Sequence, residues 1–232
     1  MTKDFVKISP LRILEMSSQK GLGRGNLGVL IARAGVGKTA CLIHIGLDKL
    51  FRKEKLVHVS LEAAPEKITS YYDVIFSDLV MALKMDRDDE IRTLIAKNRM
   101  ILSYLNQSFE LRRLRENLAN LANKIDFMPD TIIVDGLDFP SAGADVIEGF
   151  KEIAQASEAE IWFSALSHRD ITDVNERGIP YPCDHLDDLF SIILQLEPSQ
   201  SSILLRLLKD HGSAIRPDAS VKLDPKTFLI TD

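Results

Sequence analysis

Short apolar runs alternate along the chain with longer segments in which apolar residues recur every three or four positions. The short runs predict buried strands at 27–32, 55–62, 99–105, 131–139 and 161–167. The periodic segments predict helices at 38–51, over most of 66–98, from Ser108 onward and around 146–153. Strands that alternate with helices indicate right-handed crossovers and a largely parallel sheet.

From residue 189 onward, strand patterns follow one another with no helix between them. The segments 189–196 and 202–209 flank the turn-like EPSQSS and predict a hairpin, and VKLDPKTFLI predicts two further short strands. We therefore expect an α/β fold of three layers, with a mostly parallel sheet and antiparallel strands at its C-terminal edge. The length suits one domain, so residues 1–232 are expected to form a single domain.

Composition narrows the class of protein. With 45% hydrophobic and 27% charged residues, the chain is expected to be soluble and globular. No apolar run suits a signal peptide or a membrane-spanning helix, and the two cysteines have no motif spacing. We therefore expect a cytoplasmic protein with reduced thiols and no membrane contact. The formal net charge of −5 argues against a surface built mainly to hold nucleic-acid phosphates.

The stretch IARAGVGKT, at 31–39, has the layout of a P-loop: a strand, a glycine-bearing turn and the start of a helix. Glycines let backbone N–H groups turn toward phosphate oxygens, and the helix adds its positive end. Lys38 would reach the β- and γ-phosphates, and the Thr39 hydroxyl would ligate Mg²⁺. Ala32 stands where the strict motif has its first glycine, and the alternative is an ordinary turn with a solvated lysine. The expected phosphate-binding residues are Ala34, Gly35, Val36, Gly37, Lys38, Thr39 and Ala40.

Two acidic residues end neighbouring strand patterns. Asp135 follows the β-favouring TIIV, and we expect it to hold the metal's water shell together with Thr39. Glu62 ends LVHVSLE, so it would project to the same sheet edge and polarise a water in line with the γ-phosphate. The alternatives are a turn aspartate and a helix-capping or solvated glutamate.

Taken together, several segments between residues 10 and 230 resemble the RecA-like ATPases, in the branch of KaiC and the DnaB helicases. The segments are GLGRGNLGVLIARAGVGKT, VSLEAAPEKI, TIIVDGLDF, ALSHRD and LLKDHGSAIRPDASVKLDP. The resemblance implies ATP as the nucleotide, Mg²⁺ as the metal and Glu62 as the catalytic base. The chain has the size of the single-domain, RepA-type members.

The resemblance also implies a homo-oligomeric ring, with a hexamer as one ring size, and two further groups at the nucleotide. Ser167 and His168, in ALSHRD, would sense the γ-phosphate. Lys209 would reach the nucleotide of a neighbouring subunit, as would an arginine two residues later. That arginine position is occupied by His211 here, with Arg216 as the alternative finger.

Three functions fit these motifs. Helicases of this branch grip DNA with loops that correspond to 136–144 and 169–188 here, and the first of these has no basic residue. In the second, two positive and six negative side chains leave a net charge of −4, which makes a poor phosphate track. These are Arg169 and Arg177 against Asp170, Asp173, Glu176, Asp184, Asp187 and Asp188. We therefore favour a regulatory or motor ATPase that acts on a protein partner, with a small DNA helicase and a weakly hydrolysing scaffold as alternatives.

Overall fold

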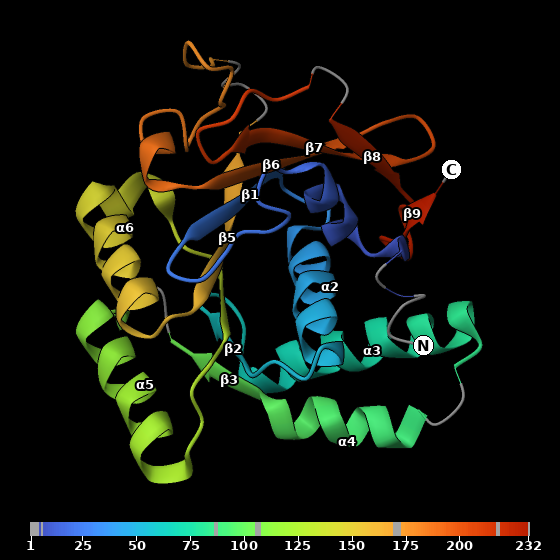
Figure 1. Cartoon of the computed structure of the whole chain (residues 1–232), viewed down its shortest axis with the longest axis vertical. Helices are drawn as coiled ribbons and strands as arrows, with labels where there is room; N and C mark the ends of the chain where they lie inside the picture. The colour runs from blue at the N-terminus through green and yellow to red at the C-terminus, as the bar shows by residue number, and fades with distance from the viewer. Residues whose placement is uncertain are drawn as a thin grey trace.

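The computed structural model describes residues 5, 7–85, 88–104, 108–168, 173–216 and 219–231. Within this part of the chain, nine strands form one sheet in the order β3, β2, β4, β5, β1, β6, β7, β8, β9 (Figure 1). The strands are β1 Leu27–Arg33, β2 Leu56–Ser60, β3 Arg99–Ser103, β4 Thr131–Asp135, β5 Glu160–Ser167, β6 Ile192–Pro198, β7 Ile203–Asp210, β8 Ser220–Leu223 and β9 Ile230–Thr231.

The sheet is parallel from β3 to β6 and antiparallel from β6 to β9. This confirms the predicted α/β fold with a mostly parallel sheet and antiparallel C-terminal strands. β5 lies between β1 and β4, so the strand before the glycine-bearing loop and the strand that ends in Asp135 share one neighbour. β2 pairs with β4 on the other side, and Ser60 lies opposite Asp135. This strand order brings the ends of four parallel strands to one edge of the sheet.

Helices cover both faces of the sheet (Figure 1). On one face, α2 (Lys38–Phe51), α3 (Pro65–Leu83) and α4 (Asp88–Asn98) contribute buried residues to one apolar cluster. On the other face, α5 (Leu111–Ile125) and α6 (Phe139–Ala156) contribute to a second cluster. The parallel strands read as nearly continuous apolar runs because both of their faces are buried.

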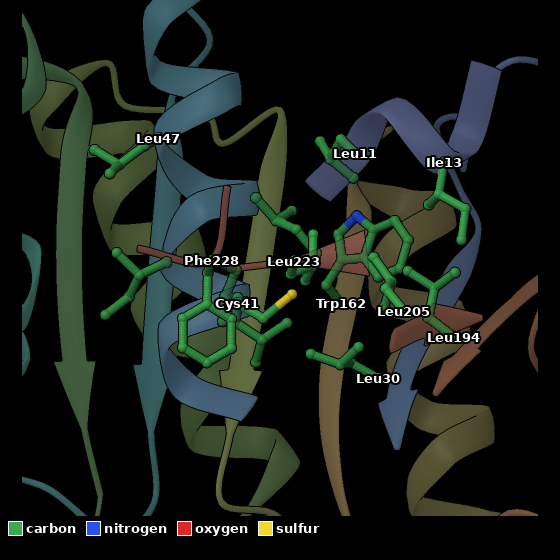
Figure 2. Close-up of a cluster of buried hydrophobic side chains, with 14 of the residues drawn as sticks. Leu11, Ile13, Leu30, Cys41, Leu47, Trp162, Leu194, Leu205, Leu223 and Phe228 are labelled. Atoms are coloured by element: carbon green, nitrogen blue, oxygen red, sulfur yellow. The ribbon is translucent and has the colours of Figure 1, made fainter. Parts of the chain in front are cut away.

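Trp162 on β5 lies at the centre of the cluster on the α2 side, among side chains from η1 (Pro10–Met16) and from the antiparallel strands (Figure 2). A Cβ built on Gly28 of β1 would come within 2.7 Å of the indole ring, so a glycine is needed opposite this tryptophan. Cys41 of α2 is buried in the same cluster, and burial raises the pKa of its thiol to about 12. Cys41 and Cys183 are both free thiols, as predicted.

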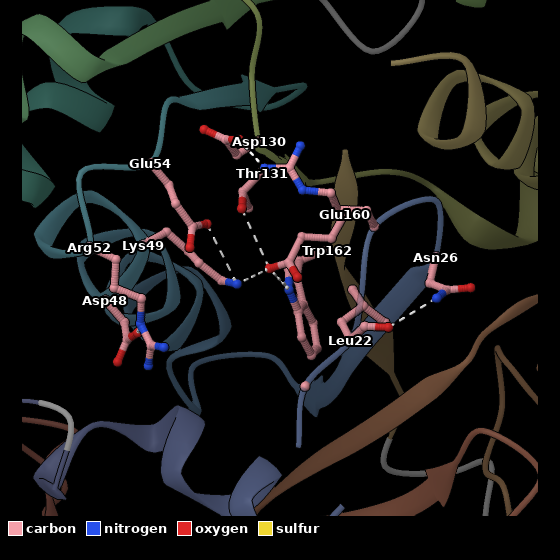
Figure 3. A network of polar contacts seen from close by, with 12 residues as sticks. Leu22, Asn26, Asp48, Lys49, Arg52, Glu54, Asp130, Thr131, Glu160 and Trp162 are labelled. Atoms are coloured by element: carbon pink, nitrogen blue, oxygen red, sulfur yellow. Dashed lines mark hydrogen bonds and ion pairs between the residues drawn. The ribbon is translucent and has the colours of Figure 1, made fainter. Parts of the chain in front are cut away.

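A buried polar network lies at the start of β5 (Figure 3). Glu160 is 2.6 Å from the Nζ of Lys49, and its Oε1 accepts hydrogen bonds from Trp162 Nε1 at 3.2 Å and Thr131 Oγ1 at 3.4 Å. Burial lowers the pKa of Lys49, but the charges of Glu160 and Glu54 outweigh it, so this pKa is raised. The buried carboxylate is therefore matched by a cation and two donors.

Several sequence predictions are wrong at the ends of elements, among them the strand predicted at 55–62, which ends at Ser60 as β2 and leaves Glu62 on the loop that follows. α5 begins at Leu111 with Glu110 at its N-cap, instead of Ser108. β4 ends at Asp135 instead of reaching residue 139, because Gly136 turns the chain with a φ of +87°. α6 then begins at Phe139, so most of the loop expected at 136–144 is helical. No helix among the described residues is long and apolar enough to cross a membrane.

Candidate functional site

The segment between β1 and α2 turns through two glycines just before the helix begins. Gly35 and Gly37 have φ values of +76° and +102°, in the left-handed region that favours glycine. Gly37 is also the N-cap of α2, with no side-chain hydrogen bond to the cap. The first N–H groups of the helix therefore keep their capacity to bind an anion, and the helix dipole is positive at this end.

A pocket of about 380 Å³ opens at this edge of the sheet. It brings together most of the predicted phosphate-loop residues with Glu62 and Asp135, and adds four residues that the sequence analysis did not select. The lining residues are Ala34, Gly35, Gly37, Lys38, Thr39, Glu62, Asp135, Gly136, Leu137, Ser164 and Leu166. Of the predicted loop, Val36 and Ala40 do not line the pocket and pack against the apolar cluster on the α2 side.

Lys38 lies inside the pocket with its ammonium group on the loop's own carbonyls. Its Nζ donates to the carbonyl oxygens of Ala32 at 3.3 Å and Arg33 at 3.4 Å. Burial lowers the pKa of Lys38, while the nearby charges of Asp135 and Glu62 raise it and offset part of that effect. The amine thus faces two carboxylates and is placed to meet an anion that enters the pocket.

Asp135 receives a hydroxyl donor on each of its carboxylate oxygens. Thr39 Oγ1 donates to Oδ2 at 2.7 Å, and Ser164 Oγ donates to Oδ1 at 2.6 Å. Ser164 also accepts a hydrogen bond from the N–H of Gly136 at 3.0 Å. The first turn of α2 and the ends of β4 and β5 are thereby joined through one buried carboxylate.

Glu62 lies on a short loop after β2 that is held on both sides. The N–H of Ala63 donates to Ser60 Oγ at 3.0 Å, and Ser103 Oγ donates to the carbonyl oxygen of Ala63 at 2.8 Å. The N–H of Leu61 donates to the carbonyl oxygen of Asp135 at 2.9 Å. The loop's backbone is fixed, and the exposed Glu62 carboxylate lies at the pocket, on the side of β4 away from Ser164.

The oxygen atoms of Thr39 and Asp135 suit Mg²⁺, which prefers hard oxygen ligands. Among the described residues, no group of three or more His, Cys, Asp and Glu could hold a metal ion. Mg²⁺ commonly keeps several waters and binds one or two protein groups together with substrate phosphates. The residues present therefore fit a metal that arrives with a phosphate ligand, and they do not form an all-protein metal cage.

Ser167 and His168 do not line the pocket. Side chains alternate between the faces of a strand, so Ser164 and Leu166 share the pocket face of β5 and Ser167 lies on the other face. The exposed His168 ring lies 6.2 Å from the ring of Tyr181, centroid to centroid. Ser164 could have been found from the sequence, because it is a polar residue inside an otherwise apolar strand that pairs with the strand of Asp135.

The predicted trans-acting residues also lie outside this pocket. Lys209 donates to the carbonyl oxygen of Asp187. Burial lowers the pKa of Lys209, and the charges of Asp187 and Asp188 oppose this. His211 Nε2 lies 3.1 Å from the carbonyl oxygen of Gly21, and Arg216 is exposed. A role for any of them at a nucleotide therefore requires a second subunit.

The acidic loop before β6 carries Arg177, which pairs with two carboxylates. Its NH1 is 2.7 Å from Asp187 and 2.5 Å from Asp188. Arg169 and Asp170, which the charge argument also counted, lie outside the described residues. Arg177 is thus paired with two carboxylates of its own loop.

The pocket combines a helix N-terminus, a lysine, a hydroxyl–carboxylate pair and a further carboxylate. Such a set can bind a polyphosphate with its metal ion and can orient a water molecule next to it. A scan against protein-family models and a search among curated proteins both find no match to this chain.

Proposed function

We propose that this chain is a RecA-like ATPase that binds ATP with Mg²⁺ in the pocket at 34–39 and hydrolyses it. The observation that carries the proposal is the 2.7 Å hydrogen bond from Thr39 Oγ1 to Asp135 Oδ2. These residues are 96 positions apart, and they belong to two separate motifs that were predicted to share one metal ion. Their contact is what a P-loop and its partner acid require.

Binding begins with the phosphates. The N–H groups at the start of α2 donate to phosphate oxygens, and Lys38 exchanges the carbonyls of Ala32 and Arg33 for the β- and γ-phosphates. Thr39 Oγ1 would offer a lone pair to the metal while its O–H donates to Oδ2 of Asp135. When bound, Mg²⁺ neutralises charge that develops on the phosphate oxygens. The left-handed glycines keep side chains away from this part of the loop.

Hydrolysis needs a group that orients and deprotonates water. Glu62 fits this role because its carboxylate lines the same pocket as Lys38, Thr39 and Asp135 and is not buried. A glutamate beside the γ-phosphate accepts the proton of the attacking water as the bond to phosphorus forms. The leaving group is ADP, and the products are ADP and phosphate.

We further propose that subunits assemble in a ring, with a hexamer as one ring size. The assembled ATPase acts on a protein partner. The acidic loop before β6 supports a protein partner over DNA, since Arg177 is paired with Asp187 and Asp188. A weakly hydrolysing scaffold is the second candidate. The observation that favours it is that Lys209, the predicted trans-acting lysine, is bonded to Asp187 within its own subunit.

The test is ATP turnover by the purified full chain, with and without single-stranded DNA, together with its mass in solution. We expect Lys38→Ala to abolish turnover, and Glu62→Gln to reduce it by about 10²- to 10⁴-fold with ATP binding retained. Glu66→Gln, an exposed glutamate in the first turn of α3, is the matched control and should stay within about twofold of wild type.

Each alternative has its own outcome in this experiment. DNA-stimulated turnover by a ring would favour the helicase and contradict the charge argument. A ring that binds ATP with turnover as low in wild type as in Glu62→Gln would favour the scaffold. Turnover that survives in both Lys38→Ala and Glu62→Gln would overturn the proposed site.

A further inference from the structure

Ser164 is the polar residue that the strand β5 buries beside the pocket. Its side chain is almost fully buried, at 3% exposure, in the apolar run Ile161–Phe163 and Ala165. A buried hydroxyl is costly unless it is hydrogen-bonded. Both of its hydrogen bonds run to the end of β4: it donates to Asp135 and accepts from Gly136. The single proton of the hydroxyl is therefore used on the acid predicted to serve the metal ion.

The direction of these hydrogen bonds is determined by the donors present. A serine hydroxyl has one proton, and the backbone N–H of Gly136 can only donate. The proton of Ser164 therefore points at Oδ1 of Asp135, while the proton of Thr39 points at Oδ2. Two donors from opposite sides hold the carboxylate plane in one orientation.

We infer that Ser164 is a positioning residue that holds the Asp135 carboxylate in the orientation at which Thr39 and Asp135 together receive a Mg²⁺ ion with its nucleotide. This inference rests on the proposed function. Thr39 can offer a lone pair to a metal ion only while its O–H points at Oδ2 of Asp135 and donates to it. A carboxylate free to rotate would draw that proton, and the oxygen that carries it, away from the metal position. Ser164 prevents the rotation through its 2.6 Å hydrogen bond to Oδ1, so it acts on the metal position through Asp135.

Groups that orient metal ligands from behind typically contribute 10- to 100-fold to metal affinity. The measurement is the affinity for a fluorescent ATP analogue as Mg²⁺ is titrated, and its midpoint is the Mg²⁺ concentration that gives half of the metal-dependent gain. We therefore expect Ser164→Ala to raise this midpoint by roughly tenfold or more. Affinity for the analogue in EDTA should not change, because Lys38 and the helix N-terminus are untouched. Ser164→Thr retains the hydroxyl and should recover most of the Mg²⁺ response.

Ser17→Ala is the matched control. Ser17 Oγ also donates to a buried aspartate, Asp210 Oδ1, at 2.7 Å, but this pair does not line the pocket. We expect Ser17→Ala to lower stability without moving the Mg²⁺ midpoint. Equal Mg²⁺ midpoints in wild type and Ser164→Ala would overturn the positioning role. If Ser164→Ala fails to fold, a Ser164→Thr midpoint raised about tenfold or more above wild type would overturn it instead. A wild-type protein whose nucleotide affinity ignores Mg²⁺ would instead overturn the proposed function, and with it this inference.

Discussion

The side chain of Glu62 lies directly against the backbone of Gly136. A Cβ built on Gly136 would come within 2.6 Å of Glu62 Cγ, and Gly136 has a φ of +87°. Gly136 directly follows Asp135 at the end of β4, so the predicted catalytic base packs on the residue next to the predicted metal acid. The position of Glu62 thus depends on the absence of a side chain at residue 136.

The first prediction concerns this contact. Gly136→Ala should lower ATP turnover by about tenfold or more, because Glu62 must move to make room for the new methyl group. ATP affinity should change less than turnover, since Glu62 is not needed to bind the phosphates. The measurement is the turnover number together with the dissociation constant of ATP.

Gly143→Ala is the control for the backbone cost. Gly143 also has a positive φ, +69°, but a Cβ there would meet no atom within 4 Å. An alanine there carries the backbone cost of a positive φ, on the order of 1–3 kcal/mol, without any displacement of Glu62. An equal loss of turnover in both variants would show that strain, and not Glu62, is responsible.

A second prediction compares two glycines of the phosphate loop. A Cβ at Gly37 would lie 2.0 Å from Cζ of Phe228, whereas a Cβ at Gly35 would meet nothing within 4 Å. Both residues have positive φ, so both alanine variants carry left-handed strain. We expect Gly37→Ala to lose about 1–3 kcal/mol more stability than Gly35→Ala in urea unfolding without nucleotide, from overpacking against Phe228. Equal stabilities would contradict the packing of Phe228 under the loop.

The third prediction concerns pH. Burial lowers the pKa of His44 and of His58 to about 4, from an ordinary value of 6.5. Below pH 6.5 the unfolded chain takes up protons that these folded histidines do not, so stability falls from about pH 6.5 to pH 4 and rises with pH in that window. Each histidine should account for about 3 kcal/mol of the loss at pH 4.

Replacement of either histidine tests this directly. We expect His44→Leu and His58→Leu each to reduce the difference in unfolding free energy between pH 7 and pH 4 by about 3 kcal/mol. The absolute stability of a variant at pH 7 does not enter the comparison. A pH-dependent loss as large in the variants as in wild type would contradict the burial of neutral imidazoles.

A fourth prediction separates stability from the site. Lys49→Met leaves Glu160 buried without its cation, and we expect a loss of about 3–5 kcal/mol (Figure 3). Lys49→Met combined with Glu160→Gln should recover much of this loss, because the carboxylate that lost its cation is replaced by a neutral amide. Both variants should bind ATP like wild type while folded. Glu160 is the first residue of β5, whereas Ser164, which lines the pocket, lies further along the strand. A single variant as stable as wild type in urea unfolding would contradict the coupling.

The elements of the fold could be predicted because each has a local signal. Apolar runs mark the strands, and the glycine-bearing turn before Lys38 marks both a strand end and a helix start. The ends of elements are less predictable, as β4 shows: its apolar pattern continues past Asp135, but Gly136 turns the chain. A backbone angle of this kind depends on what packs nearby, here Glu62.

The candidate site divides in the same way. Lys38, Asp135 and Glu62 could be proposed because each is placed by its own short segment, and all of them line one pocket. Ser164 depends on the pairing of β4 with β5, and Phe228 depends on the return of the C-terminal strands to the loop at Gly37. Both contacts join residues far apart in the sequence. The apolar run around Ser164 marks it as an unusual polar residue, but it does not identify Asp135 as its partner.

The most direct test of the account is the affinity of the purified chain for ATP, measured by titration calorimetry with Mg²⁺ and again in EDTA. The account predicts one ATP per subunit, tighter binding with Mg²⁺ than in EDTA, and a loss of at least about tenfold in affinity in Lys38→Ala, whose ammonium group lies in the pocket. Absence of ATP binding by the wild-type chain, or equal binding by Lys38→Ala, would contradict it.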